Sequence, residues 1–337
     1  MRIAAYVAFV LGLAGAIGLI AWHGFATVSR AMEALGAGVL LLPLIYAPHY
    51  FGAAFSWSLN FPAGRCPPFA KVLRAIWVGI AVETLMPLGG LAAEVTKARL
   101  LIRAGTPPTD AAALAVVDMT VQIVVLIFWA ILGFSALIIT GPNESLFWPI
   151  VIGAGFLALA IGTLLYAQYA GLFGKLAQFG ARMLRSERWQ GLADNAHHLD
   201  RTIRSIYARP LRVAAACAIR CATRGLMAVE IWVAAWLMDH PISPSDAVMF
   251  IGIISTLRAA AFVVPGGLGV QEAAYVILGQ LVGLAPDIAI ALSLASRARE
   301  LMTGVPALLF WQVLEGRSLR RLMSRRPRPL ASELDPA

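Results

Sequence analysis

The sequence predicts an all-α polytopic membrane protein, with about six transmembrane helices and two re-entrant hairpins of opposite orientation that form an inverted repeat. Three observations lead to this fold class: the composition, a repeated proline–glycine motif and the placement of basic residues between apolar segments. Of the 337 residues, 60% are hydrophobic and 13% are charged, and the mean hydropathy is +0.78. Soluble globular domains carry about 25% charged residues, so this chain is expected to lie in a membrane.

Long apolar segments alternate with shorter polar ones along the chain. The apolar segments cover approximately residues 3–22, 35–59, 72–94, 111–140, 147–168, 211–238, 246–283 and 287–313. A helix crosses the hydrocarbon core in about 20 residues, so most of these segments are long enough to span it. The first is long for a signal peptide and lacks a small-residue cleavage site, which predicts an uncleaved span. We expect one membrane domain over residues 1–313 and a basic cytoplasmic tail over 314–337.

Two of the apolar segments contain the same unusual motif. In each, a proline and a pair of glycines interrupt the apolar run, and a glutamate follows seven residues after the proline. The first copy consists of Pro87, Gly89, Gly90 and Glu94, and the second of Pro265, Gly266, Gly267, Gly269 and Glu272. Repeated broken helices with acidic residues at membrane depth are typical of secondary transporters, which bind their substrates near the bilayer midplane.

Basic residues between the apolar segments predict the orientation of the chain. They gather in residues 65–74, 97–103, 175–212 and 317–328. Because Lys and Arg concentrate in cytoplasmic loops, these regions and both chain termini are expected in the cytoplasm. Segment 72–94 must then enter from the cytoplasm and return to it, whereas 246–283, with acidic or neutral flanks, must enter and return on the outside. The alternative is that proline and glycine only kink full spans, since both are frequent in membrane helices.

The formal charge of +9 also raises the question of nucleic-acid binding. No nucleic-acid motif is present, and loops that face anionic lipids account for the same charge, so no nucleic-acid partner is expected. Residues 171–209 mix apolar and basic side chains at helical spacing, which predicts an amphipathic helix on the inner leaflet or, alternatively, a lipid-headgroup site. Cys217 and Cys221 lie one helical turn apart without a histidine or carboxylate at ligand spacing, so no metal or other cofactor is expected.

Several charged residues remain inside the apolar segments, where each costs about 2.5–3.5 kcal/mol on insertion scales. The candidate substrate-binding residues are Glu83, Glu94, Arg99, Asp118, Arg258, Glu272, Arg297, Arg299 and Glu300. Snorkelling toward the interface is the simpler explanation for Arg99 and for Arg220. For the others, two interpretations stay open: structural ion pairs within the bundle, or a polar binding cavity at its centre.

The last apolar segment carries three of these charges near its middle. Arg297 and Glu300 are three residues apart and can pair on one helix face, whereas Arg299 points elsewhere. The expected partners of Arg299 are Glu272, Glu94 or Asp118. Arginine binds phosphate through two parallel hydrogen bonds, and helix N-termini at hairpin tips favour negative charge. This chemistry suits an amphiphile with an anionic or polyhydroxylated headgroup.

Four stretches of the chain are similar to a known family. They are residues 83–101, 116–122, 263–275 and 289–301. Together they resemble the lysylphosphatidylglycerol-synthase-like transmembrane (flippase-like) family, and more narrowly its subgroup associated with hopanoid biosynthesis. The first motif departs from the family pattern, because Glu83 and Thr84 stand where an asparagine usually precedes the proline.

The resemblance implies a multi-pass protein of the bacterial inner (cytoplasmic) membrane that translocates lipids or supports their synthesis. In founding members of the family, a similar membrane domain is fused to a soluble aminoacyl-tRNA-dependent transferase domain. This chain continues for only about 24 residues after residue 313, so lipid aminoacylation is not expected of it.

Three classes of function follow from these observations. The leading hypothesis is a carrier that moves a phospholipid, a hopanoid or a polyprenyl-type lipid between leaflets, with membrane lipids as its partners. The second is a non-transporting scaffold that recruits lipid- or hopanoid-biosynthesis enzymes through the basic loop at 171–209. The third is a membrane-embedded enzyme acting on a lipid headgroup. The sequence shows no nucleophile–base pair and no cluster of metal ligands, so no catalytic residues and no enzymatic activity are expected.

Overall fold

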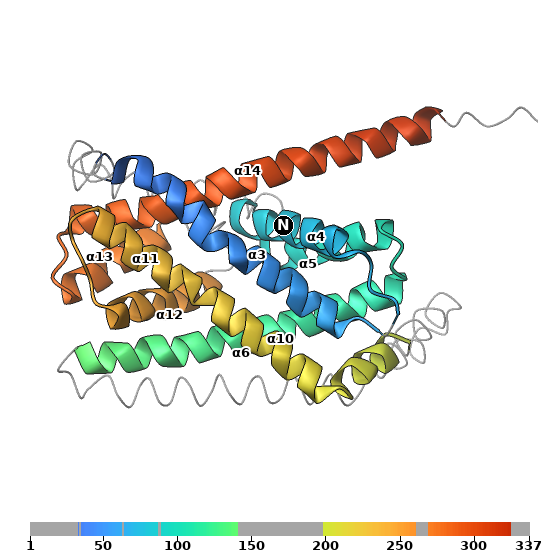
Figure 1. Ribbon diagram of the computed structural model, residues 1–337, viewed down its shortest axis with the longest axis horizontal. Coiled ribbons are helices and arrows are strands. Elements are labelled where there is room, and N and C mark those ends of the chain that lie inside the picture. Colours follow the sequence, from blue (N-terminus) through green and yellow to red (C-terminus); the bar gives the residue numbers. More distant parts are fainter. Residues whose placement is uncertain are drawn as a thin grey trace, which may run out of the picture.

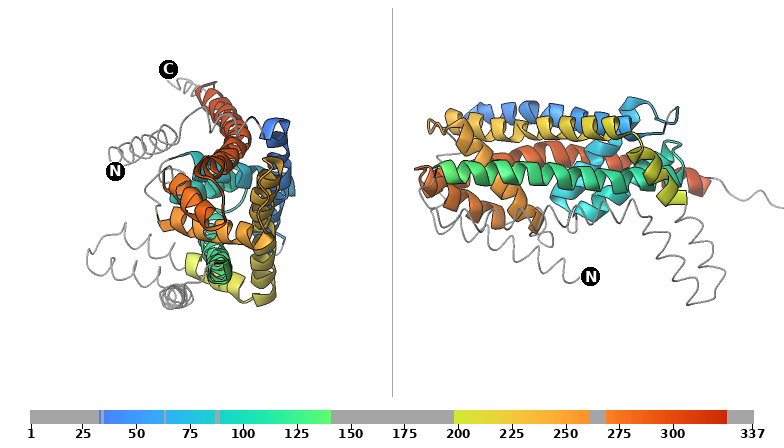
Figure 2. Two further views of the ribbon diagram at one scale, coloured as in Figure 1. Left: turned by 90° about the vertical axis from the view of Figure 1, so that its left-hand side faces the viewer. Right: turned by 90° about the horizontal axis from the view of Figure 1, so that it is seen from below.

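The computed structural model describes residues 33, 35–62, 64–86, 89–140, 198–260 and 269–324 (Figures 1 and 2). Every regular element in these residues is helical, which confirms the predicted fold class at this level. The predicted segments 3–22 and 147–168 lie outside the described residues, as do most of the loop 171–209 and the tail from residue 325 onward.

The helices follow the apolar segments in position but not always in length. In chain order they are η1 (Gly36–Leu40), α3 (Leu41–Asn60), α4 (Phe69–Leu85), α5 (Gly89–Arg103), α6 (Pro108–Thr140), α10 (Pro210–Arg224), α11 (Leu226–Leu237), α12 (Pro244–Ala260), α13 (Val270–Leu281) and α14 (Pro286–Ser324). A further helix covers residues 198–207. Two helical stretches, Gly36–Asn60 and Pro108–Ile138, are long and apolar enough to cross a membrane by length and composition.

Some helices extend beyond the predicted boundaries. Helix α5 continues to Arg103, so the basic residues Lys97 and Arg99 lie in a helix and not in a loop. Two residues after α5 ends, Gly105 has φ 103°, a conformation that glycine adopts without strain and that commonly follows a helix. Helix α14 continues to Ser324, into the predicted tail.

The helix at 198–207 belongs to the predicted amphipathic loop. Its Ile203 and Ile206 are buried in the main hydrophobic core, whereas Arg201 and Arg204 are exposed. In these residues the apolar face of the helix is therefore covered by the protein itself.

The helices are interrupted at both proline–glycine motifs. Helices α4 and α5 are separated by residues 86–88, and α12 and α13 by residues 261–269, and the helices of each pair pack against each other. The tips fall mostly outside the described residues, including Pro87, Pro265, Gly266 and Gly267. Gly89 and Gly90 form the start of α5. Gly269 has φ 78°, and its N–H donates to the Glu272 carboxylate at 2.7 Å, which caps α13.

The two helix pairs open toward opposite ends of the molecule (Figure 1). The flanks of the α4–α5 pair are held together, because Arg65 pairs with Asp110 at 3.2 Å and Lys71 donates to the Ala104 carbonyl at 3.4 Å. These flanks lie at the right-hand end of Figure 1, whereas the turns before α12 and after α13 lie at the left-hand end. Helices α6 and α14, which follow the two pairs, run in opposite directions along the molecule.

Contacts between the two halves of the chain are reciprocal. The long helix α6, which follows the first pair, packs on α12 of the second pair, and α14 in turn packs on α4 of the first. Helix α3 packs on both α10 and α11.

Burial in this structure departs in two respects from the pattern in soluble proteins. Charged side chains that soluble proteins almost never bury fully are inside, among them Lys97 and Arg299, which are 1% and 2% exposed. Large apolar side chains lie on the outside, including Phe51, Phe55, Ile131, Trp236, Ile277 and Leu309. Charged groups inside an apolar core, together with large apolar side chains on the surface, fit a lipid environment.

Helices α6 and α12 approach each other closely at a pair of glycines. A Cβ atom added to Gly252 would lie 2.3 Å from the Trp129 carbonyl oxygen and 2.7 Å from the Gly133 Cα atom. Both neighbours are backbone atoms, so neither can move aside without shifting its helix. Small residues at such crossings let membrane helices pack backbone to backbone.

We expect Gly252→Val to destabilise the protein by about 1–3 kcal/mol or more, because the added side chain forces α6 and α12 apart. The control is Gly90→Ala, since a Cβ at Gly90 meets nothing within 4 Å. Thermal unfolding of both purified variants in detergent measures the effect. Equal melting temperatures for the two variants would show that the α6–α12 crossing does not depend on the glycine pair.

Candidate functional site

The candidate residues of the first half meet in a buried group of charges, the first cluster, formed by Glu94, Lys97, Asp118, Gln122 and Arg220. The Lys97 ammonium donates to Glu94 and lies 3.1 Å from Asp118 Oδ2. Arg220 pairs with the other oxygen of Asp118. The Gln122 amide donates to Glu94 at 2.8 Å and to Asp118 at 2.9 Å. The cluster therefore ties α5, α6 and α10 together.

Local helix geometry and one glycine place Lys97 in this cluster. Glu94 and Lys97 are three residues apart, so they share one face of α5. The aliphatic part of Lys97 lies against Gly79 of α4, where an added Cβ would be 2.4 Å from Lys97 Cγ. The ammonium group lies 5.7 Å from the ring centroid of Trp57 on α3, within cation–π range.

The second half contains a matching group, the second cluster, formed by Arg258, Gln271, Glu272, Arg297 and Glu300. Glu300 accepts from Arg258 at 2.7 Å and from Arg297 at 3.2 Å. Arg297 also donates to Glu272 at 3.1 Å, and Arg258 donates to the Gln271 side-chain oxygen at 2.9 Å. This cluster connects α12 and α13 to α14, and it confirms the predicted pairing of Arg297 with Glu300.

The partner predicted for Arg299 was wrong. Its Nε atom donates to Glu230 of α11 at 2.9 Å, and its guanidinium lies 4.0 Å from the ring centroid of Tyr46 on α3. None of the three predicted partners Glu272, Glu94 and Asp118 takes this place; the nearest further acid contact is Glu300, at 4.0 Å. The reason is geometric, because Arg299 faces α3 and α11 and not the hairpin helices.

The two motif glutamates occupy equivalent positions. Glu94 follows the first helix break and is joined through Lys97 and Gln122 to Asp118 on α6. Glu272 follows the second break and is joined directly to Arg297 on α14. Each glutamate thus connects a hairpin to the long helix after it, although the cation comes from the hairpin in one half and from the long helix in the other.

Two other candidates lie outside these clusters, and one further expectation was wrong. Glu83 and Arg99 are exposed, on α4 and α5 respectively. Arg220 was expected to snorkel, but it is 6% exposed and paired with Asp118. It lies in the interior because the face of α10 that carries it packs on α3 and α6.

Sequence reasoning missed Lys97 and Glu230 as members of the site. The spacing between Glu94 and Lys97 was a usable signal, but counting Lys97 as a loop cation hid it. No local spacing points from Glu230 to Arg299, because 69 positions separate them.

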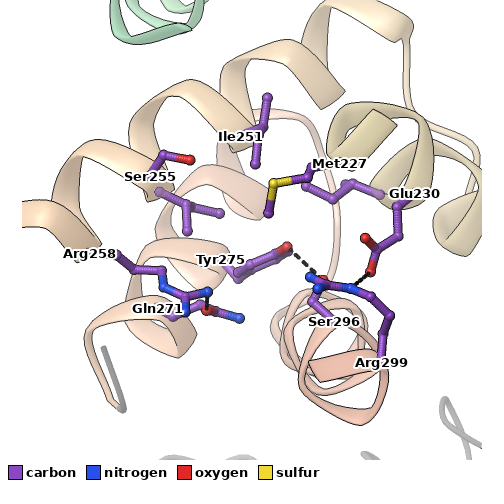
Figure 3. Close-up of a pocket in the computed structure, with 11 residues that line it drawn as sticks. Met227, Glu230, Ile251, Ser255, Arg258, Gln271, Tyr275, Ser296 and Arg299 are labelled. Atoms are coloured by element: carbon purple, nitrogen blue, oxygen red, sulfur yellow. Dashed lines mark hydrogen bonds and ion pairs between the residues drawn. The ribbon is translucent and has the colours of Figure 1, made fainter. Parts of the chain in front are cut away.

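A small cavity lies between the second cluster and the Arg299–Glu230 pair (Figure 3). Figure 3 shows Arg258 and Gln271 on one side, Arg299 and Glu230 on the other, and Tyr275 between them. The cavity has a volume of about 30 Å³. It holds about two water molecules, because each needs about 10–15 Å³ on this measure. A lipid headgroup is much larger, so headgroup binding here requires the charged side chains to separate.

The described part of the chain shows no group of three or more His, Cys, Asp and Glu side chains arranged to hold a metal ion. Cys217 and Cys221 are free thiols there, both half-buried on α10.

Comparison with known proteins gives one clear result. No curated protein matches the chain. A family model described as "Lysylphosphatidylglycerol synthase TM region" matches residues 9–307, a span that includes both hairpins and every residue of the two clusters. The chain therefore belongs to the lysylphosphatidylglycerol synthase transmembrane-region family of membrane proteins.

Proposed function

We propose that this protein is a lipid carrier that moves a phospholipid, a hopanoid or a polyprenyl-type lipid between the leaflets of the bacterial inner membrane. Membership of the family supports a lipid-related role in a membrane. The observation that carries the proposal is the pair of matching charged clusters, each of which ties a broken-helix hairpin to the long helix after it.

The arrangement of the helices supports an inverted repeat with α4–α5–α6 as one unit and α12–α13–α14 as the other. The units open toward opposite ends of the molecule, their long helices run in opposite directions, and their contacts are reciprocal (Figures 1 and 2). In this proposal the two hairpins are re-entrant, one from the cytoplasm and one from the outside. Inverted repeats let a transporter expose one central site to each side in turn.

The energetics of buried ion pairs also favour a role of the clusters in lipid transport over a role in stabilising the fold alone. Buried ion pairs are weak stabilisers, because removing two charges from water costs about as much as their attraction returns. An apolar core of similar volume is often at least as stable. Charges that can exchange partners, in contrast, give a polar lipid headgroup a path through the apolar bundle.

A transport assay tests the proposal directly. Purified protein is reconstituted into vesicles that contain a fluorescent phosphatidylglycerol labelled on an acyl chain, and dithionite added outside bleaches the outer leaflet. We expect the protected inner-leaflet signal to be lost faster than in protein-free vesicles. Glu272→Gln, which weakens one of the links between the second hairpin and α14, should slow this loss. A wild-type rate equal to that of protein-free vesicles, with insertion verified, would contradict transport of this lipid.

The scaffold alternative makes a different prediction. The helix at 198–207 exposes Arg201 and Arg204, which offers a basic surface to a partner enzyme. A scaffold would lose its cellular role on replacement of these two arginines and would keep it in Glu272→Gln. A carrier would show the opposite pattern, and neither outcome requires a catalytic residue.

A further inference from the structure

Arg224 differs from the other interior arginines of the bundle. Arg220, Arg258, Arg297 and Arg299 each pair with an acidic side chain. Arg224 lies one helical turn after Arg220, and within the described residues it pairs with no acid. Its Nε atom is buried without a hydrogen-bond partner.

Arg224 is a surplus charge beside the two clusters and the Arg299–Glu230 pair. The first cluster holds two acids and two cations, the second cluster does as well, and Arg299 and Glu230 balance each other. Arg224 thus adds one positive charge to an otherwise neutral set. Arg224 is half-buried, and its Nε atom is shielded from water without a hydrogen-bond partner. An unpaired charge is costly in an apolar environment, so an anionic partner is expected at this position.

Glu83 is a candidate for this anionic partner, but it forms no ion pair with Arg224. Among the acidic side chains it is the one whose charge attracts Arg224. Glu83 is nevertheless exposed, and it forms no ion pair with any residue that the structure describes, Arg224 included.

The backbone around Arg224 is held at a helix junction. Arg224 ends α10, and α11 begins two residues later after Gly225. Trp129 of α6 supports this junction, because its indole N–H donates to the Cys221 carbonyl at 3.1 Å. Its ring also lies 3.1 Å from the position that a Cβ on Gly225 would occupy. The backbone at Arg224 is thus held in place by packing, while its guanidinium retains a hydrogen-bond donor without an acceptor.

We propose that Arg224 binds the phosphate group of a lipid headgroup, and that the negative charge of Glu83 opposes this binding. The inference rests on the proposed lipid-carrier function and names its substrate class, a phosphate-bearing lipid. A guanidinium stays charged and offers planar, parallel donors that match two phosphate oxygens. Arg224 lies one helical turn after Arg220 of the first cluster, at the junction with α11, the helix that carries Glu230.

Two substitutions that each remove a charge, Arg224→Gln and Glu83→Gln, should have opposite effects on lipid binding. Native mass spectrometry of detergent-purified protein, titrated with phosphatidylglycerol, measures retention of the lipid. Arg224→Gln is expected to weaken retention about tenfold or more, because a desolvated charge contact is lost. Glu83→Gln is expected to strengthen retention, because the competing carboxylate is removed. Arg212→Gln, at an exposed arginine of the same helix, is the matched control and should leave retention within about twofold.

Further arms identify the source of the phosphate and separate a folding defect from lost binding. Arg224→Lys keeps the charge and should retain part of the lipid binding. A larger loss of phosphatidylglycerol retention in Arg224→Gln than in Arg224→Lys therefore supports the site. Displacement of phosphatidylglycerol by inorganic phosphate at similar concentration would overturn the lipid assignment in favour of free phosphate. Wild-type retention in Arg224→Gln, or weaker retention in Glu83→Gln, would overturn the proposal.

The transport assay distinguishes failure of this inference from failure of the proposed function. If the wild type moves lipid and Arg224→Gln moves it equally fast, the carrier function stands and the role of Arg224 is wrong. If the wild type moves no lipid but holds phosphatidylglycerol through Arg224, the carrier function is wrong and the phosphate site stands.

Discussion

Asp118→Asn is expected to destabilise the protein by about 3–5 kcal/mol, because it removes one partner from a buried charge network. Asp118 is 3% exposed and accepts from both Lys97 and Arg220. Lys97 retains Glu94 after the substitution, but Arg220 loses the one acid with which it pairs in the described residues. Asparagine keeps the shape of aspartate, so the effect reports the charge.

The matched control for this substitution lies on the same helix. Asp110→Asn removes an acid that pairs with Arg65, whose side chain is 61% exposed. Asp110 is itself buried, but its partner reaches water, so the substitution leaves no buried unpaired cation and should destabilise the protein less than Asp118→Asn does. Adding Arg220→Met to Asp118→Asn should restore part of the lost stability, because it removes the uncompensated charge. Equal melting temperatures for Asp118→Asn and Asp110→Asn would show that the first cluster contributes little to the fold.

Glu300→Gln is expected to slow lipid translocation about tenfold or more while the protein stays folded. Glu300 links Arg258 of α12 to Arg297 of α14, at 2.7 Å and 3.2 Å. Arg297 keeps the acid Glu272. Arg258 keeps the side-chain oxygen of Gln271, and its side chain is 22% exposed, so water can solvate the charge that Glu300 no longer balances. The substitution removes a charge-assisted hydrogen bond, worth about 1.5–3 kcal/mol, and so weakens the link between the second hairpin and α14.

The vesicle assay and a melting curve together decide this prediction. Asp287→Asn, at the start of α14, removes an acid of the same helix outside the cluster and should leave the rate unchanged. A Glu300→Gln variant that melts like the wild type and still moves lipid at the wild-type rate would rule out this coupling. It would leave the clusters as structural ion pairs.

Local patterns in the sequence predicted a substantial part of this architecture. The glycine motifs marked both helix breaks, and the three-residue spacing of Arg297 and Glu300 gave their ion pair. Both features depend on neighbouring residues alone: the conformational freedom of glycine and the periodicity of a helix. They could therefore be found without knowledge of the packing.

The features that sequence reasoning missed all depend on tertiary packing. Lys97 is inside because Gly79 on another helix leaves space for its side chain. Loop-charge counting assumes that a lysine between apolar segments faces water, and it has no means to detect such space. Arg299 meets Glu230 because α14 and α11 are brought together around α3, far beyond any local spacing.

Cysteine labelling of the hairpin flanks tests the central claim, a pair of re-entrant hairpins of opposite orientation, most directly. Single cysteines are placed in a variant without native cysteines and labelled in intact and opened cells with a membrane-impermeant maleimide. Suitable exposed positions are Cys66, Pro107, His240 and Ala285. We predict that cysteines at 66 and 107, which flank α4–α5, react only from the cytoplasm, and that those at 240 and 285, which flank α12–α13, react only from outside. Labelling of the two flanks of either hairpin from opposite sides would show that its helices form a full span, and it would contradict the inverted repeat.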